Sequence, residues 1–363
     1  MVQVVARGRT ALIVAVVAVI AIVAGCGPNF AATPRALTPA KVGFSTDGFF
    51  EWESNADLAR DLDATAATGA SWIRLSFDWS KIQKTSSAAF DWTMEDRLVA
   101  AAQARHLKVL GLMTYTPQWA RRASCTGTDK CPPRNTAEFA AFATAVVRRY
   151  APRGIHAWEI WNEPNNPDFW AASISAADYV ALLKPTYAAI HAADRNATVV
   201  SGGLAPHGDL GRDPHDVRSP VNYVKAMYAA GVHGSLDAVG HHPYPPLPYS
   251  PLVANTGWNA VMQTVTIHDV MAANGDGGRQ IWGTEFGTPT GTTSMGVSEL
   301  KQAQYLTDEI QQWSTWSFTG PLFVHMIRDR PYDRTDWAYD LGLMRSNGTA
   351  KPAYLAIKFL LRG

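Results

Sequence analysis

Two glutamates stand at the ends of short apolar runs that are typical of buried β-strands. Glu163 directly follows the run 155–162, and Glu285 lies near the end of the run 280–286. Two carboxyl groups held about 5 Å apart can cleave a glycosidic bond, one as the nucleophile and the other as the proton donor. Like charges this close push their pKa values apart, so that one group stays ionised and the other protonated. The pair is a candidate catalytic centre if the fold brings the two together.

Other polar residues close strand-like runs in the same way. Arg74 and Asp78 end one run, Asn162 ends the run before Glu163, and the remaining residues of this kind are His242, Tyr244 and His325. In (β/α)8 barrels the active site lies at the carboxyl ends of the strands. We therefore expect these side chains to converge on the two glutamates.

Strand-like and helical runs alternate from residue 41 onward, which predicts a single α/β domain, a (β/α)8 TIM barrel, over residues 41–363. The predicted strands are 41–46, 71–78, 108–115, 155–162, 197–203, 236–242, 280–286 and 320–327. The predicted helices are 56–68, 94–106, 136–150, 177–194, 221–230, 258–273, 298–315 and 351–361. A doubly wound open sheet is the structural rival, but no G-x-G-x-x-G turn follows the first strand.

The segment around Glu163, Trp-Glu-Ile-Trp-Asn-Glu-Pro-Asn (158–165), resembles strand 4 of the clan A glycoside hydrolases, particularly families 5 and 39. Ile-Trp-Gly-Thr-Glu-Phe-Gly (281–287) is similar to strand 7 of that clan. Ser-Gly-Gly (201–203), His242-Pro-Tyr244 and the Thr-Pro-x-Trp-Ala of 116–120 also look like this clan. The resemblance implies a retaining glycosidase with Glu163 as acid/base and Glu285 as nucleophile.

The resemblance also implies roles for the surrounding residues. Arg74 would keep Glu285 ionised, Tyr244 would hydrogen-bond it, and Asn162 would bind the 2-hydroxyl of the sugar. His242 would orient the acid/base or the sugar. The residues alone leave alternatives open: Arg74 pairing only with Glu159, His242 as a core histidine, and Tyr244 shaping a loop.

Aromatic residues and the last strand bear on which sugar is bound. Trp119 follows the third predicted strand and is our first candidate for stacking on a sugar ring. Family 5 relatives usually carry a tryptophan at the end of strand 8, whereas the run here is Leu-Phe-Val-His-Met-Ile (322–327) with His325. We therefore expect His325 to bind substrate and the sugar to differ from that of a standard cellulase or mannanase, with a cell-envelope glycan as one candidate.

The N-terminus reads as an export signal. Arg7 and Arg9 precede an apolar run, 11–25, that is too short to span a bilayer and ends in Val-Ala-Gly before Cys26. These residues resemble the lipobox of bacterial lipoproteins, which implies a signal peptide over 1–26, lipidation of Cys26 and a membrane anchor. Residues 27–40 read as a flexible tether. The alternative is an ordinary signal peptide in which Cys26 is incidental.

Five residues separate Cys125 from Cys131, and Gly127, Pro132 and Pro133 mark a loop. Export makes a disulfide permissible, and closing so short a loop stabilises by about 2 kcal/mol. Zinc binding is the alternative, although two cysteines without a nearby histidine or second cysteine pair make a poor zinc site.

The net charge of the chain bears on which ligands it can bind. A net charge of +1 gives no electrostatic footprint for nucleic acid, and we expect a carbohydrate substrate, no cofactor or metal, and a monomer. A non-catalytic sugar-binding lipoprotein on the same fold is the alternative function. A barrel lyase or aldolase would require a lysine or a metal cluster at the strand ends, which the sequence does not show.

Overall fold

The computed structural model describes residues 41–46, 48–207, 213, 215–245, 259–331 and 336–363. The expected signal peptide, the tether and Cys26 lie outside the described residues. Within them, no helix is both long enough and apolar enough to cross a bilayer.

Eight parallel strands form one closed barrel in sequence order, with β1 paired to β8. The strands are β1 Val42–Ser45, β2 Trp72–Asp78, β3 Lys108–Thr114, β4 Ala157–Asn162, β5 Thr198–Gly203, β6 Ala238–His241, β7 Gln280–Phe286 and β8 Thr319–His325. This confirms the predicted (β/α)8 barrel and excludes the open sheet. Each predicted strand differs from the observed one by at most a few residues.

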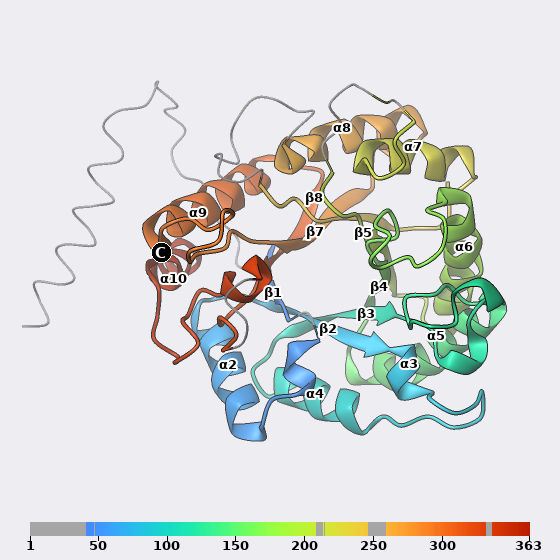
Figure 1. Ribbon diagram of the computed structural model, residues 1–363, viewed down its shortest axis with the longest axis horizontal. Coiled ribbons are helices and arrows are strands. Elements are labelled where there is room, and N and C mark those ends of the chain that lie inside the picture. The colour runs from blue at the N-terminus through green and yellow to red at the C-terminus, as the bar shows by residue number, and fades with distance from the viewer. Residues whose placement is uncertain (1–40, 47, 208–212, 214, 246–258, 332–335) are drawn as a thin grey trace, which may run out of the picture. The chain divides into compact units, whose positions relative to one another are not determined.

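The helices surround the barrel (Figure 1). They are α2 Asn55–Ala67, α3 Trp79–Ile82, α4 Thr93–Gln103, α5 Thr136–Tyr150, α6 Ala176–Ala193, α7 Pro220–Ala229, α8 Ala260–Ala273, α9 Glu299–Thr315 and α10 Pro352–Arg362. Short 3-10 turns lie at η2 Phe49–Glu51, η3 Gln118–Ala120, η4 Ala123–Cys125, η5 Ala151–Arg153 and η6 Trp337–Asp340. The sequence did not predict α3, the single turn that follows β2.

Local sequence explains where the long helices begin. A serine or asparagine side chain accepts a backbone N–H from the first turn of most of them, which satisfies a donor that has no partner inside the helix. These caps are Ser54, Asn135, Ser175, Ser219, Asn259 and Ser298.

Apolar side chains fill both faces of the strands. One cluster of buried residues lies between the barrel and its helices, and a smaller one lies inside the barrel, made of Leu110, Ala157, Val200, Ala238, Trp282 and Phe323. Polar side chains from the carboxyl ends of the strands lie beyond this inner cluster, so the strands act as a rigid frame for them.

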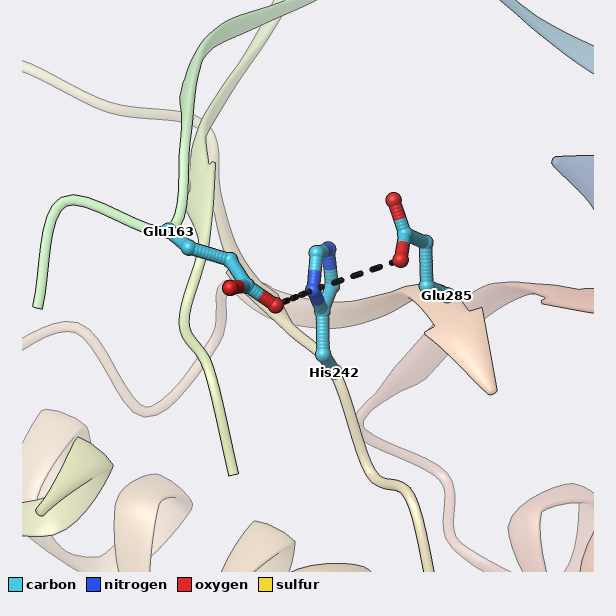
Figure 2. Close-up of side chains that lie close together, drawn as sticks. All are labelled: Glu163, His242 and Glu285. Atoms are coloured by element: carbon cyan, nitrogen blue, oxygen red, sulfur yellow. Dashed lines mark hydrogen bonds and ion pairs between the residues drawn. The ribbon is translucent and has the colours of Figure 1, made fainter. Parts of the chain in front are cut away.

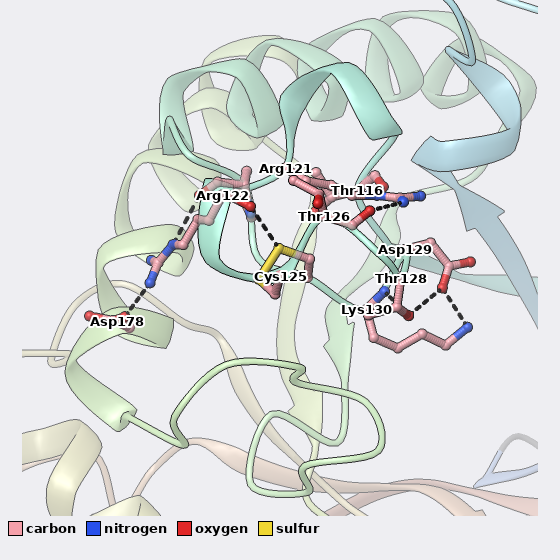
Figure 3. The surroundings of a disulfide bond; sticks show 11 residues. Thr116, Arg121, Arg122, Cys125, Thr126, Thr128, Asp129, Lys130 and Asp178 are labelled. Atoms are coloured by element: carbon pink, nitrogen blue, oxygen red, sulfur yellow. Dashed lines mark hydrogen bonds and ion pairs between the residues drawn. A yellow bond between two sulfur atoms is a disulfide. The ribbon is translucent and has the colours of Figure 1, made fainter.

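The predicted disulfide is present: Cys125 and Cys131 are joined with an S–S distance of 2.04 Å. It closes the loop after β3, which is also tied to α6 because Arg122 Nη1 lies 2.6 Å from Asp178 Oδ2 (Figure 3). The bond therefore holds one loop in place on the rim of the barrel.

Candidate active site

Glu163 and Glu285 come together at the carboxyl ends of β4 and β7. Both are buried, with 8% and 6% of their surface exposed. Oxygen atoms of the two carboxyl groups and Nδ1 of His242 all lie within 4.8 Å of one another. This spacing suits direct attack by one carboxylate, because inverting glycosidases keep their carboxyl groups about 6.5–9.5 Å apart to admit a water.

The backbone around Glu163 departs from regular strand geometry. In a regular strand, Asn162 and Glu163 would point to opposite faces. Trp161 and Glu163 instead have φ angles of 72° and 45°, and both Asn162 and Glu163 face the site. The left-handed conformation costs about 1–2 kcal/mol at a non-glycine residue. Buried contacts offset that cost, since Trp161 Nε1 donates to Phe169 O at 2.9 Å and the Glu163 N–H donates to Gly203 O at 3.0 Å.

His242 lies between the two glutamates (Figure 2). Its Nδ1 is 2.8 Å from Glu163 Oε1 and 3.7 Å from Glu285 Oε2. Burial disfavours the charged imidazole, but the negative charge of Glu285 and the hydrogen bond to Glu163 outweigh it and raise the pKa of His242. The ring has room because residue 203 is glycine: a Cβ there would lie 2.2 Å from His242 Nε2.

The neighbouring His241 shows the contrast. It is fully buried, its Nε2 lies 2.9 Å from Ala260 O, and burial lowers its pKa to about 4. His241 is therefore a core histidine, whereas His242 contacts Glu163 and belongs to the site, which excludes the alternative of His242 as a core histidine.

Glu285 is surrounded by cationic and hydrogen-bonding groups. Arg74 Nη1 donates to its Oε1, Tyr244 Oη lies 3.0 Å and His325 Nδ1 3.2 Å from its Oε2. Burial by itself would raise the pKa of Glu285, but the charges of His242 and Arg74 and the hydrogen bond to His325 hold it well below its usual range. The structure therefore favours an ionised Glu285.

Arg74 serves two carboxylates at once. Besides Glu285, its Nε lies 2.6 Å from Glu159 Oε2, and its Nη2 donates to Asn162 Oδ1 at 2.9 Å. Glu159 is fully buried and also accepts from the Gly203 N–H and the Thr284 hydroxyl, each at 2.9 Å. Arg74 thus pairs with Glu159 and also contacts the candidate nucleophile, which excludes the alternative that it pairs only with Glu159.

One residue of the site escaped the sequence analysis. Asn166 Nδ2 donates to Glu163 Oε2 at 2.8 Å. Its position three residues after Glu163, in a turn, is the only signal that would have indicated it.

Trp119, by contrast, is placed away from this cluster. It packs edge-on against Trp79 with ring centroids 5.5 Å apart, and its Nε1 donates to Gln83 O at 2.8 Å. Its stacking on a sugar ring stays a prediction.

Glu163, His242 and Glu285 also form the donor set that could hold a metal ion among the described residues. One imidazole and two carboxylates suit several divalent metals. Arg74, however, already places a buried positive charge on Glu285, and a cation bound there would be repelled by it.

The barrel and the close spacing of the two carboxyl groups at the ends of β4 and β7 fit a glycoside hydrolase of the retaining class. A protein-family comparison agrees, since the cellulase model, glycosyl hydrolase family 5, matches residues 37–320. The chain therefore belongs to glycosyl hydrolase family 5 and is a retaining glycosidase acting on O-glycosidic bonds. Among curated proteins, no sequence matches this chain.

Similar solved structures share the fold. A family 39 glycoside hydrolase from the gut symbiont Bacteroides cellulosilyticus WH2 superposes with a TM-score of 0.71 at 19% identity, over 92% of this chain and 66% of that one. A family 39 β-xylosidase from Caulobacter crescentus superposes with a TM-score of 0.67 at 21% identity, over 91% of this chain and 72% of that one. GH5_18 from Streptomyces cattleya, in complex with GlcNAc, superposes with a TM-score of 0.66 at 17% identity, over 90% of this chain and 80% of that one. This chain thus spans slightly less than two thirds of the Bacteroides enzyme's length.

Proposed function

We propose that the protein hydrolyses a β-linked oligosaccharide or polysaccharide, with Glu285 as nucleophile and Glu163 as acid/base. One arrangement carries the assignment: oxygens of the two carboxyl groups lie within 4.8 Å of each other, and of Glu163 and Glu285 it is Glu285 that is bonded to Arg74. The β linkage is supported by the name of one similar structure, the Caulobacter β-xylosidase.

In the first step, the Glu285 carboxylate attacks the anomeric carbon while Glu163 gives its proton to the glycosidic oxygen. The bond between that carbon and oxygen breaks, and the leaving sugar departs with the proton. A glycosyl ester on Glu285 remains. His242 and Asn166, both bonded to Glu163, stabilise the carboxylate that the proton leaves behind.

In the second step, the Glu163 carboxylate takes a proton from water, whose oxygen attacks the anomeric carbon. The ester bond to Glu285 breaks, and the sugar is released with its original configuration. Arg74, Tyr244 and His325 stabilise the regenerated carboxylate of Glu285 through the contacts described above.

The configuration of the first product tests this mechanism. During hydrolysis of an aryl β-glycoside, proton NMR is expected to show the β-anomer first, with the α-anomer rising later by mutarotation. An α-anomer as the first product would contradict the double displacement. A panel of plant and cell-envelope polysaccharides then identifies the natural substrate, for which we propose an envelope glycan because a lipid anchor would hold the enzyme beside it.

We also propose that the protein is exported and lipidated at Cys26. Growth of an expressing bacterium with an alkyne-tagged fatty acid is expected to label the full-length protein, and Cys26→Ser should abolish the label. Cys131→Ser is the matched control, because it removes a cysteine within the barrel and should stay labelled. A parent protein without label would contradict the anchor.

A further inference from the structure

A cavity of about 220 Å³ adjoins the candidate catalytic residues on the side of β1 to β4. Arg74 and Asn162 line it, and these two are bonded to each other and, through Arg74, to Glu285. Glu163, His242 and Glu285 are not themselves among its lining residues. The cavity therefore adjoins the candidate catalytic centre through Arg74 and Asn162, where it can hold a sugar residue of a substrate bound at Glu285.

One wall of the cavity comes from η2, β2 and α3. Lys81 Nζ lies 2.7 Å from Glu51 Oε2 and 3.5 Å from Asp78 Oδ2. The lysine side chain is 43% exposed, whereas the two carboxylates are 5% and 4% exposed. The Lys81 ammonium is thus the group of this wall that solvent reaches, and the two buried carboxylates hold it in position.

Other lining residues come from the loop after β3 that the disulfide closes, and Figure 3 shows Asp129 and Lys130 on this loop. Lys130 Nζ lies 2.8 Å from Asp129 Oδ1 and 4.2 Å from the centre of the Tyr115 ring. The Thr116 N–H donates to Asp129 O at 2.8 Å, which ties this loop to the end of β3. The Lys130 ammonium therefore occupies one face of the Tyr115 ring.

We propose that this cavity binds one neutral, hydroxyl-rich sugar residue of the substrate, through hydrogen bonds to Lys81 and Lys130 instead of through aromatic stacking. The inference rests on the proposed function and adds the class of sugar. An ammonium carries three N–H donors, and a carboxylate accepts hydrogen bonds from hydroxyls. A wall that carries both lysines and acidic residues can therefore donate to one sugar hydroxyl and accept from the next. The volume is below the ~300–1,000 Å³ of pockets for drug-sized ligands and suits one ring.

The charged groups that line the cavity favour a neutral sugar over an acidic one. The walls carry the carboxylates of Glu51, Asp78 and Asp129 against the ammonium groups of Lys81 and Lys130. The charge of Arg74 is already matched by Glu159 and Glu285. A uronic acid or sulfated sugar would therefore enter a site without spare positive charge and lose its hydration there.

The test uses Lys81→Met and Lys130→Met in the full-length protein, with Lys84→Met as the matched control because Lys84 is exposed and does not line the cavity. On the best neutral substrate of the panel, each cavity variant is expected to raise KM about tenfold, the effect of one lost charged hydrogen bond, with kcat changed much less. Lys84→Met should match the parent. Thermal unfolding of each variant separates this effect from misfolding.

A second arm compares aryl glucosides with glucuronides and aryl galactosides with galacturonides. The neutral member of each pair is expected to have the higher kcat/KM. Parental KM in both lysine variants, or preference for the acidic member, would overturn the inference, while loss of activity in Glu285→Gln would still uphold the proposed function. A protein that cleaves no glycoside would contradict both.

Discussion

Glu285→Gln is expected to lower kcat on aryl glycosides by on the order of 10⁵-fold, which is typical of removing a catalytic nucleophile. The amide has the shape of the carboxylate but cannot form the glycosyl ester. The measurement is release of dinitrophenolate from a dinitrophenyl β-glycoside, whose leaving group departs without a proton. Because leaving-group departure needs no acid in this substrate, the loss reports the nucleophile alone.

Glu163→Gln provides the complementary result. A general acid contributes about 10²- to 10⁴-fold, so this variant should lose that much in the first step on alkyl or phenyl glycosides. On the dinitrophenyl glycoside it should keep a rapid first step, seen as a burst of dinitrophenolate, followed by slow turnover. Added azide should restore turnover in this variant, because azide attacks the glycosyl ester without a general base. Parental kinetics in both glutamine variants would refute the assignment.

Arg74→Met is expected to destabilise the fold by about 3–5 kcal/mol, because it leaves Glu159 and Glu285 buried without their shared cation. Arg74 and Glu159 are 2% and 0% exposed, so water cannot replace the lost contact. Urea unfolding of parent and variant measures the loss. Arg345→Met is the matched control: its partner Glu299 also lies at 2.6 Å, but both side chains are well exposed, so the expected cost is at most about 1 kcal/mol.

The same substitution has a predicted effect on pH dependence. Arg74 helps to hold the pKa of Glu285 below its usual range against the effect of burial. Without the arginine this pKa rises, so a larger fraction of Glu285 is protonated in mild acid, and the acidic limb of kcat/KM should move to higher pH. Equal losses of stability in Arg74→Met and Arg345→Met, or an unmoved acidic limb, would contradict the role of Arg74.

The sequence determined the barrel and most of the residues at its mouth. Short apolar runs that alternate with helical stretches favour inner parallel strands, and serine or asparagine caps set where helices such as α5 and α9 begin. Since parallel strands in a barrel all end at one rim, Glu163 and Glu285 could be expected together although they are distant in the chain. The local disulfide was predictable because so few residues separate Cys125 from Cys131.

Only the tertiary structure decided how those residues face one another. The left-handed backbone at Trp161 and Glu163 breaks the two-residue alternation of a strand, and it persists because buried contacts from other elements offset its cost. Two features depend on side-chain directions and loop paths: Arg74 pairs with both Glu159 and Glu285, and Lys81 and Lys130 line one cavity. Periodicity in a sequence specifies which face of a strand is buried, but packing between distant segments sets the positions of polar atoms to within a hydrogen-bond length.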